Sequence, residues 1–267
     1  MNKTEILAII NQKGGVGKTT TAINLAAGIA LKNKNVLVID LDPQGNATTG
    51  LGISNSENSD ETVYAVLNGT KKITDVIKKS NFDNLDIISS NVDLSGLEVE
   101  TASDNRRAFI LKEQITAYLN DNEGKYEYIL IDCPPSLSLL TVMALVASHS
   151  LVVPLQTEFF ALEGLTQLMK TIDRIKINLN SELKIKGILL TMYDKRNKLS
   201  GQVEKEARDY FKEKVYSTVI PRNVRLSEAP SHGIPVLVYD KTCPGSKSYF
   251  NFTEEFLNKE ENYESAA

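Results

Sequence analysis

A glycine- and lysine-rich segment, Lys13–Thr20 (KGGVGKTT), separates a short apolar run from a helical pattern near the start of the chain. The apolar residues of Glu5–Asn11 indicate a buried β-strand, and the apolar spacing of Thr19–Leu31 indicates an α-helix. The glycines allow a tight turn between these two elements. A strand, a glycine turn and a helix in direct succession predict an α/β fold with the turn beyond the carboxyl end of the strand.

The same alternation of short apolar runs and amphipathic segments continues along the chain. Several runs lack polar alternation, as strands do in a parallel sheet that is covered on both faces. We therefore predict a doubly wound, mostly parallel sheet in a single domain over residues 1–267, with a surface loop at Ser54–Asp60 and a disordered acidic end at about 258–267. The further strands are expected at Val36–Asp42, Leu85–Ser89, Tyr128–Asp132, Leu151–Leu155, Ile185–Met192 and Val215–Ile220, and the further helices at Asn105–Leu119, Leu139–Ala147, Leu162–Ile177 and Gln202–Lys214.

Composition narrows the classes of protein that fit. The chain has 30 Lys and Arg against 34 Asp and Glu, a formal net charge of −4, which excludes a permanently bound, highly basic DNA coat. Two cysteines, Cys133 and Cys243, exclude a disulfide-rich scaffold and are expected to be reduced thiols. The first apolar run is too short for a secretory signal, and no apolar stretch is long enough to span a membrane. We expect a cytoplasmic protein.

The segment Lys13–Thr20 has the chemistry of a phosphate-binding loop. Successive backbone N–H groups of such a turn converge on phosphate oxygens, and the N-terminus of the following helix adds partial positive charge. Lys18 can reach the outer phosphates of a nucleotide, and the Thr19 hydroxyl can ligate Mg²⁺. The common pattern G-x-x-x-x-G-K-[ST] requires glycine where this chain has Gln12, and an additional lysine, Lys13, is present.

Three aspartates stand at the ends of predicted strands. Asp40 and Asp42 close the second strand and lie on one side of it, and Asp132 closes the run Tyr128–Asp132. Parallel strands bring their carboxyl ends to one edge of a sheet, so we expect these carboxylates beside the glycine-rich turn. An aspartate that closes an apolar strand, as Asp132 does, holds nucleotide-bound Mg²⁺ in many phosphate-binding folds. Cys133, which follows Asp132, is expected to be a packing residue.

These residues resemble the deviant Walker A ATPases, whose loop is K-G-G-x-G-K-[ST], and within that group the chromosome- and plasmid-partitioning ATPases of the ParA/Soj family. The resemblance covers nearly the whole chain, which is similar to the short, Soj-like form without an N-terminal helix-turn-helix extension. Six blocks in order carry it: Asn11–Thr20, Asp40–Thr48, Asp132–Leu137, Phe160–Leu165, Leu190–Asp194 and Ile220–Ser231.

The resemblance implies an ATPase that binds ATP and Mg²⁺ and hydrolyses ATP slowly. It implies that Lys18 binds phosphates and that Asp42 positions the attacking water. Lys13 would cross an ATP-sandwich homodimer and touch the partner's nucleotide. The other implied contacts are Gly14, Gly15, Val16, Gly17 and Thr20 in the loop, Pro221 and Asn223 at the adenine, and Thr19, Asp40 and Asp132 at Mg²⁺.

In this family the ATP-bound dimer binds double-stranded DNA without sequence preference and releases it after hydrolysis, which a ParB-like centromere-binding protein stimulates. The resemblance implies the same here, with association with the nucleoid. The candidate DNA contacts are Arg196, Arg222 and Arg225, because three of the seven arginines fall in the segments 195–198 and 222–225. Contacts between arginine and phosphate carry no sequence information.

The main alternative is a MinD-like positioning ATPase, which shares the loop but ends in a basic amphipathic helix that binds membranes. Here Tyr249, Phe252 and Phe256 share one helical face while the other face is acidic, so we expect core contacts and no membrane binding. An iron–sulfur relative is disfavoured because no second cysteine lies near Cys243. A GTPase is less favoured than an ATPase because Thr191–Asp194 (TMYD) lacks the lysine of T-K-x-D. A nucleotide sensor without hydrolysis would not need the complete set of catalytic residues.

Overall fold

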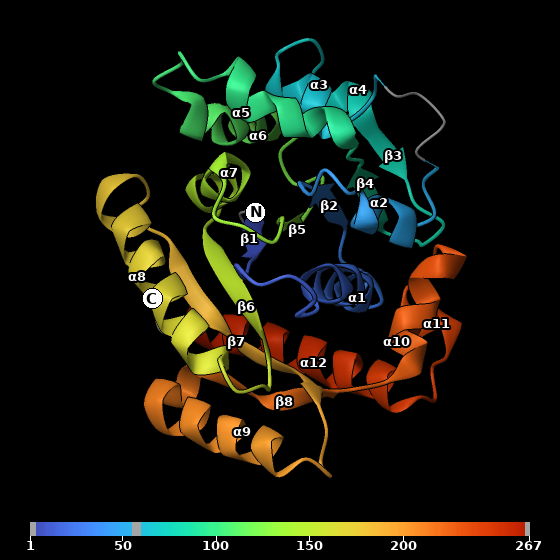
Figure 1. Ribbon diagram of the computed structural model, residues 1–267. Helices are drawn as coiled ribbons and strands as arrows, with labels where there is room; N and C mark the ends of the chain where they lie inside the picture. Colours follow the sequence, from blue (N-terminus) through green and yellow to red (C-terminus); the bar gives the residue numbers. More distant parts are fainter. Residues whose placement is uncertain (1–3, 55–59, 265–267) are drawn as a thin grey trace.

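The computed structural model describes residues 4–54 and 60–264 and has an open sheet with helices on both faces (Figure 1). The described strands join one sheet in the order β3-β4-β2-β5-β1-β6-β7-β8, and every neighbouring pair is parallel except β3 with β4 at one edge. This confirms the predicted doubly wound sheet. The strands are β1 (Glu5–Ile9), β2 (Val36–Asp40), β3 (Ile77–Lys79), β4 (Leu85–Ile88), β5 (Tyr128–Asp132), β6 (Ser150–Gln156), β7 (Lys184–Tyr193) and β8 (Val215–Pro221).

Helices pack against both faces of the sheet. They are α1 (Lys18–Ala30), α2 (Asn46–Gly50), α3 (Val63–Leu67), α4 (Ile73–Val76), α5 (Leu97–Glu100), α6 (Ile110–Asp121), α7 (Leu139–Ala147), α8 (Ala161–Asn178), α9 (Lys198–Phe211), α10 (Val224–Glu228), α11 (Val236–Tyr239) and α12 (Pro244–Glu264). The helices α1, α11 and α12 cover one face, and α6, α7, α8 and α9 cover the other.

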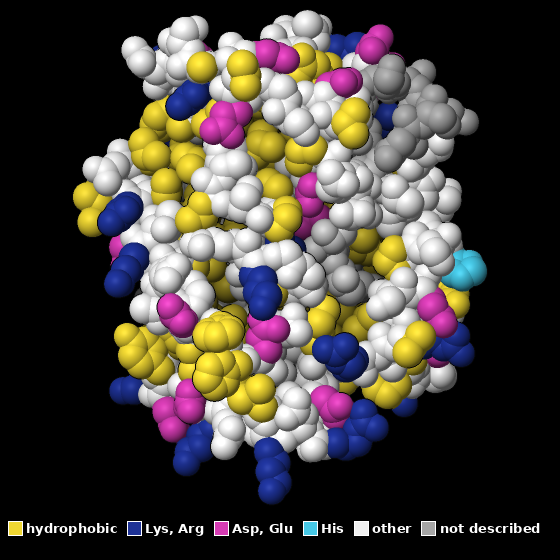
Figure 2. Space-filling view, in the orientation of Figure 1, with side chains coloured by type: hydrophobic (Ala, Val, Ile, Leu, Met, Phe, Trp, Pro, Cys, Tyr) yellow, Lys and Arg dark blue, Asp and Glu magenta, His cyan; other side chains and the backbone are white. Residues whose placement is uncertain are grey.

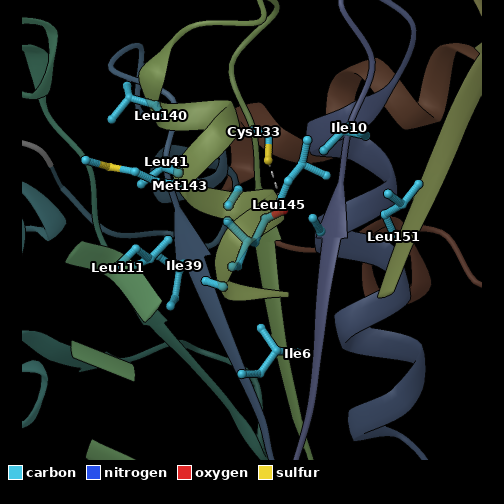
Figure 3. Close-up of a cluster of buried hydrophobic side chains, with 14 of the residues drawn as sticks. Ile6, Ile10, Ile39, Leu41, Leu111, Cys133, Leu140, Met143, Leu145 and Leu151 are labelled. Carbon is cyan, nitrogen blue, oxygen red and sulfur yellow. Dashed lines mark hydrogen bonds between the residues drawn. The ribbon is translucent and has the colours of Figure 1, made fainter. Parts of the chain in front are cut away.

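The alternation of side chains along β1 divides the core into two clusters. Leu7 and Ile9 point toward α1 and α12, whereas Ile6, Ala8 and Ile10 point toward α6, α7 and α8. Figure 3 shows part of the second cluster, in which Ile6 and Ile10 lie among side chains of β2, α6 and α7. Because both faces of the central strands are covered, a ligand reaches this sheet at the ends of its strands.

The predicted elements agree closely with the observed ones. All seven predicted strands are present within two residues of their expected ends, and β3 is an addition at the edge. The helix expected from Asn105 begins only at Ile110, because the Asp104 side chain accepts from Arg106 N–H and a 3₁₀ turn intervenes. The helix expected from Gln202 begins at Lys198, since Asn197 caps it by accepting from Leu199 N–H.

The C-terminal helix α12 packs along α1. Gly28 of α1 permits the close approach, because a Cβ atom at this position would lie 2.1 Å from Thr253 Oγ1 and 3.0 Å from Thr253 Cβ. Tyr249, Phe252 and Phe256 of α12 are almost fully buried, at 1%, 0% and 0% exposure. The prediction that these aromatic side chains are core contacts is confirmed.

Helix α12 continues to Glu264, so most of the end that we expected to be disordered from residue 258 is helical, and residues 265–267 lie outside the described residues. Residues 55–59 of the expected surface loop also lie outside them. Cys133 and Cys243 are both buried and free, as expected of reduced thiols. Within residues 4–54 and 60–264, no helix is both long enough and apolar enough to cross a bilayer.

Candidate nucleotide-binding site

The glycine-rich turn lies at the carboxyl end of β1 and leads directly into α1. Gly15 and Gly17 have φ angles of 73° and 89°, a left-handed conformation that residues with side chains rarely adopt. Gly17 is the N-cap residue of α1, and Lys18 is the first residue of that helix. The N–H groups at the start of α1, which have no partner within the helix, therefore face the edge of the sheet, where an anion can bind.

Two hydrogen bonds hold the turn from behind. Thr191 Oγ1, near the end of β7, donates to Val16 O at 2.8 Å, and both residues are buried. Lys18 Nζ donates to Lys13 O at 2.9 Å and so closes the loop on itself. The Val16 side chain lies in the interior, so its contribution to a phosphate site is its backbone N–H.

A cleft of about 490 Å³ opens over the turn, and a smaller hollow of about 200 Å³ adjoins it. The two share Gly17, Thr20, Met192 and Pro230, so they form two halves of one depression of a size typical for small-molecule sites. Of the predicted residues, the larger half is lined by Gly14, Gly15, Gly17, Lys18, Thr19, Thr20 and Asp42, and the smaller half by Pro221, Arg222 and Asn223. The structure thus brings the phosphate loop and the predicted adenine residues together.

The register of the sheet places the strand-end carboxylates side by side. Asp132 at the end of β5 pairs with Asp40 at the end of β2 on one side and with Ile9 at the end of β1 on the other. The glycine-rich turn begins just after Ile9. The expectation that these carboxylates lie at the same edge as the turn is therefore confirmed.

Asp40 is fully buried, and the segment that follows it holds its carboxylate. Thr48 donates to Asp40 Oδ2 through its N–H at 2.8 Å and its hydroxyl at 2.7 Å, and Asp42 N–H donates to Asp40 Oδ1 at 3.1 Å. Burial raises the pKa of Asp40 to about 6, although these hydrogen bonds oppose the shift. Asp40 thus ties the segment 42–48 to the sheet. Its direct contact with Mg²⁺ stays a prediction.

Asp132 is also fully buried, and neither of its carboxylate oxygens has a hydrogen-bond partner among the described residues. Burial and the neighbouring Asp40 carboxylate raise the pKa of Asp132 well above its usual value, while the Thr19 hydroxyl and the Lys18 ammonium act in the opposite direction. An unpartnered carboxylate beside a threonine hydroxyl fits Mg²⁺, which takes one or two protein oxygens together with phosphate and water. The described part of the chain has no group of three or more His, Cys, Asp and Glu side chains that could hold a metal by itself.

Lys18 and Asp42 both line the larger half of the cleft, next to the glycine-rich turn. Lys18 is only 6% exposed; burial lowers its pKa, and the neighbouring Asp132, Cys133 and Asp42 partly offset this. Asp42 Oδ1 accepts from Gln44 N–H at 3.0 Å, which fixes the orientation of the carboxylate. Burial raises the pKa of the Cys133 thiol well above its usual value, so it is a neutral packing residue, as expected.

Lys13 does not line the cleft; its ammonium forms an ion pair with Glu158, on the segment that leads into α8. The Lys13 side chain is half exposed, at 53%. Exposed ion pairs contribute only about 0–1 kcal/mol, so the ammonium can exchange this carboxylate for another anion at little cost. Contact with a partner's nucleotide, which stays a prediction, requires that exchange.

The predicted adenine side is organised around the end of β8. Asn223 Oδ1 accepts from Arg225 N–H at 3.1 Å and caps α10, which leaves the amide nitrogen as the hydrogen-bond donor of this side chain. Met192 has a φ angle of 51°, which is rare for a residue with a long side chain, and it lies where the two halves of the cleft meet.

The three candidate DNA-binding arginines lie beyond the ends of two neighbouring strands. Arg196 follows β7, while Arg222 and Arg225 follow β8. Arg222 N–H donates to Tyr193 O at 3.0 Å and so joins the two segments. The structure therefore brings these arginines to one side of the cleft, and their contact with DNA stays a prediction.

Three residues that support the site escape detection from sequence. Thr48 and Thr191 lie in blocks that carry the family resemblance, but their spacing gives no indication of their partners, Asp40 and Val16. Glu158 precedes such a block, and the sequence offers no signal for its ion pair with Lys13. All three act through contacts between segments that are distant in the chain or folded back on each other.

Comparison with known proteins agrees with this geometry. A family model described as an AAA domain matches residues 4–185. The chromosome partitioning protein ParA of Caulobacter vibrioides is 51% identical over 266 residues, which cover 100% of this chain and 98% of that protein. The sporulation initiation inhibitor protein Soj of Bacillus subtilis is 49% identical over 251 residues, which cover 94% of this chain and 97% of that protein.

Solved structures with the same fold contain nucleotides. Cobyrinic acid a,c-diamide synthase of Mycobacterium smegmatis with bound ADP and magnesium has a TM-score of 0.83 and 31% identity, with 99% of this chain and 97% of that chain covered. The septum site-determining protein MinD of Pyrococcus horikoshii, complexed with Mg-ADP, has a TM-score of 0.77 and 28% identity, with 94% and 95% covered. These similarities extend over nearly the full length of each protein.

Proposed function

This chain belongs to the ParA/Soj family of chromosome-partitioning ATPases, and from that premise we propose that it is an ATP-dependent switch for DNA segregation. It is an ATPase that uses ATP and Mg²⁺. In its ATP form two copies enclose the nucleotides and bind double-stranded DNA without sequence preference. Hydrolysis, stimulated by a ParB-like centromere-binding partner, releases the DNA, and the protein is associated with the nucleoid while ATP is bound.

One observation carries this proposal: the lining of the cleft continues into the arginine segment. Pro221, Arg222 and Asn223 all line the smaller half of the cleft, and Arg225 follows two residues later. Asn223 also accepts a hydrogen bond from Arg225 N–H, so a nucleotide that contacts Asn223 acts on the same short segment that presents the arginines. ATP bound in the cleft would therefore contact the same segment that carries Arg222 and Arg225.

The larger half of the cleft, which contains the glycine-rich turn, supports slow hydrolysis that depends on the positioning of the phosphates and the attacking water. Lys18 and the N–H groups of the turn would hold the phosphates, and Asp42, which lines the same cleft, would orient the attacking water. Thr19 and Asp132 would hold Mg²⁺, which neutralises charge on the phosphate oxygens when bound. Because Lys13 lies outside the cleft of its own chain, each site would be completed by the lysine of a second copy.

The alternative of a membrane-associated positioning ATPase gains no support from α12. A membrane-binding helix needs an apolar face that is available to lipid. The aromatic side chains Tyr249, Phe252 and Phe256 are instead packed in the interior. We therefore favour DNA as the surface on which the switch operates.

The proposal is tested by reversing one arginine charge and a matched control. Arg225→Glu should abolish retention on generic duplex DNA in the presence of ATP, because a carboxylate repels phosphates, while ATP binding persists. Arg174→Glu, on the exposed surface of α8, makes the same change in charge away from the cleft and should leave retention intact. If Arg225→Glu is still retained on DNA at low salt with ATP, the assignment of this surface to DNA is wrong.

A further inference from the structure

Two arginines of the proposed DNA-binding surface, Arg196 and Arg225, form ion pairs with nearby carboxylates. Arg196 Nε donates to Asp194 Oδ1 at 3.0 Å, and Arg196 Nη2 donates to Asp194 Oδ2 at 2.9 Å. This is a two-pronged contact of the kind that a guanidinium makes with a phosphate. Arg196 lowers the pKa of Asp194 to about 2, so this carboxylate is ionised at neutral pH.

Arg225 has two carboxylate neighbours. Its Nη1 donates to Glu228 Oε2 at 2.7 Å, and its Nε lies 3.5 Å from Asp240 Oδ2. Asp240 is itself held in place, because its Oδ1 accepts from the N–H and the hydroxyl of Thr242. The Arg225 guanidinium is thus held between the carboxylates of Glu228, on the same helix α10, and Asp240, which follows α11.

Asp194 also acts on the third arginine. Arg222 N–H donates to the carbonyl of Tyr193, the residue before Asp194, at 3.0 Å, and the positive charges of Arg196 and Arg222 both lower the pKa of Asp194. Asp194 thus lies near Arg196 and Arg222, and Glu228 and Asp240 lie near Arg225. Figure 2 shows Lys and Arg side chains interspersed with Asp and Glu along the lower edge of the molecule, where Figure 1 places α9 and the loop that leads into it from β7.

We propose that Asp194, Glu228 and Asp240 compete with DNA phosphates for these arginines and thereby set a weak, reversible affinity for DNA. This inference rests on the proposed function and names residues that regulate it. A phosphate that takes the Nε and Nη2 donors of Arg196, or the Nη1 and Nε donors of Arg225, must displace the carboxylates that now pair with them. The carboxylate that is set free takes up a cation, which cancels part of the counterion release that drives binding. The surface therefore binds DNA less tightly than three unpaired arginines would.

A different role for the same carboxylates makes the opposite prediction. If they served to hold the arginines in a shape that fits DNA, their removal would disorder the guanidinium groups and weaken binding. Competition predicts that removal strengthens binding and increases its dependence on salt. The sign of the change in affinity therefore separates the two roles.

The experiment measures the affinity of the full chain for a generic fluorescent DNA duplex, with a slowly hydrolysed ATP analogue and Mg²⁺, over a series of salt concentrations. Asp194→Asn and Glu228→Gln should each bind DNA about two- to five-fold more tightly than the unsubstituted chain, the range expected for loss of an exposed ion pair. The slope of log affinity against log salt should become steeper by up to about 0.9 for each arginine that is released. The matched control, Glu98→Gln on α5, makes the same charge change far from the arginines and should alter neither quantity.

The outcomes are distinct. Unchanged or weaker binding by Asp194→Asn and Glu228→Gln, with thermal melting showing intact folding, overturns the competition while leaving the proposed function in place. Equal strengthening by Glu98→Gln overturns it as well, because net charge would then explain the effect. If the unsubstituted chain fails to bind DNA while the two variants bind, the competition is stronger than we infer. If none of them binds DNA, the proposed function and this inference both fail.

Discussion

The hydrogen bond from Thr191 to Val16 is the contact through which β7 holds the phosphate loop, and Thr191→Val removes it with almost no change in volume. Valine leaves no cavity at this site, where Thr191 is 2% exposed, so the loss is that of a 2.8 Å hydrogen bond and a buried carbonyl without a partner. Such a loss costs about 1–3 kcal/mol. We expect this cost to be divided between the free energy of unfolding and the free energy of nucleotide binding, because the loop relaxes by moving Val16.

Two measurements on Thr191→Val give the two shares. Urea unfolding gives the loss of stability, and titration with a fluorescent ATP analogue gives the loss of affinity, which would be roughly 5- to 150-fold if the whole cost fell on binding. The matched control Thr191→Ser keeps the hydroxyl and loses one methyl group, about 0.8 kcal/mol of burial, so its affinity should stay close to that of the unsubstituted chain. The reasoning is refuted if Thr191→Val retains full stability and affinity, or if Thr191→Ser loses as much affinity as Thr191→Val.

Four other perturbations probe the remaining parts of the account. Lys13→Ala should bind ATP but fail to dimerise, as seen by size-exclusion chromatography with light scattering; a normal ATP dimer would contradict its role. Asp42→Ala should bind ATP and stay on DNA because hydrolysis stops, and normal phosphate release would remove Asp42 from catalysis. Gly28→Ala should lower the free energy of unfolding by about 1–3 kcal/mol because the new methyl group meets Thr253, and Thr253→Ala should relieve part of the loss. The pKa of Asp40 is raised from an ordinary 3.8 to about 6, so between these pH values the folded state binds more protons than the unfolded state. The free energy of unfolding without nucleotide should therefore fall as pH rises from about 4 to 6. Urea midpoints that do not change with pH in this range would contradict this prediction.

Strands and the phosphate loop could be predicted from sequence because their signals are local. Runs such as Val36–Asp40 and Tyr128–Asp132 are apolar throughout, as buried parallel strands are, and the glycines of the turn are required by φ angles that other residues avoid. The meeting of Asp40, Asp132 and the turn at one edge follows from parallel pairing alone. These parts of the site need no knowledge of side-chain contacts.

The other parts depend on contacts that no local pattern encodes. The edge strand β3 has only three residues and pairs antiparallel, so it lacks the apolar run that marks the central strands. The short helices α2 and α10 each have five residues, too few for a period to be recognised. The pairing of Lys13 with Glu158 joins residues 145 positions apart, and only the fold brings them together.

The central claim is that ATP controls DNA binding, and one comparison tests it most directly. Retention of the full chain on generic duplex DNA is measured with ADP, with ATP, and with ATP together with a ParB-like partner from the same cell. The account predicts retention with ATP, little retention with ADP, and faster release when the partner is added. Equal retention with ADP and ATP, or ATP-dependent binding to liposomes in place of DNA, would contradict it.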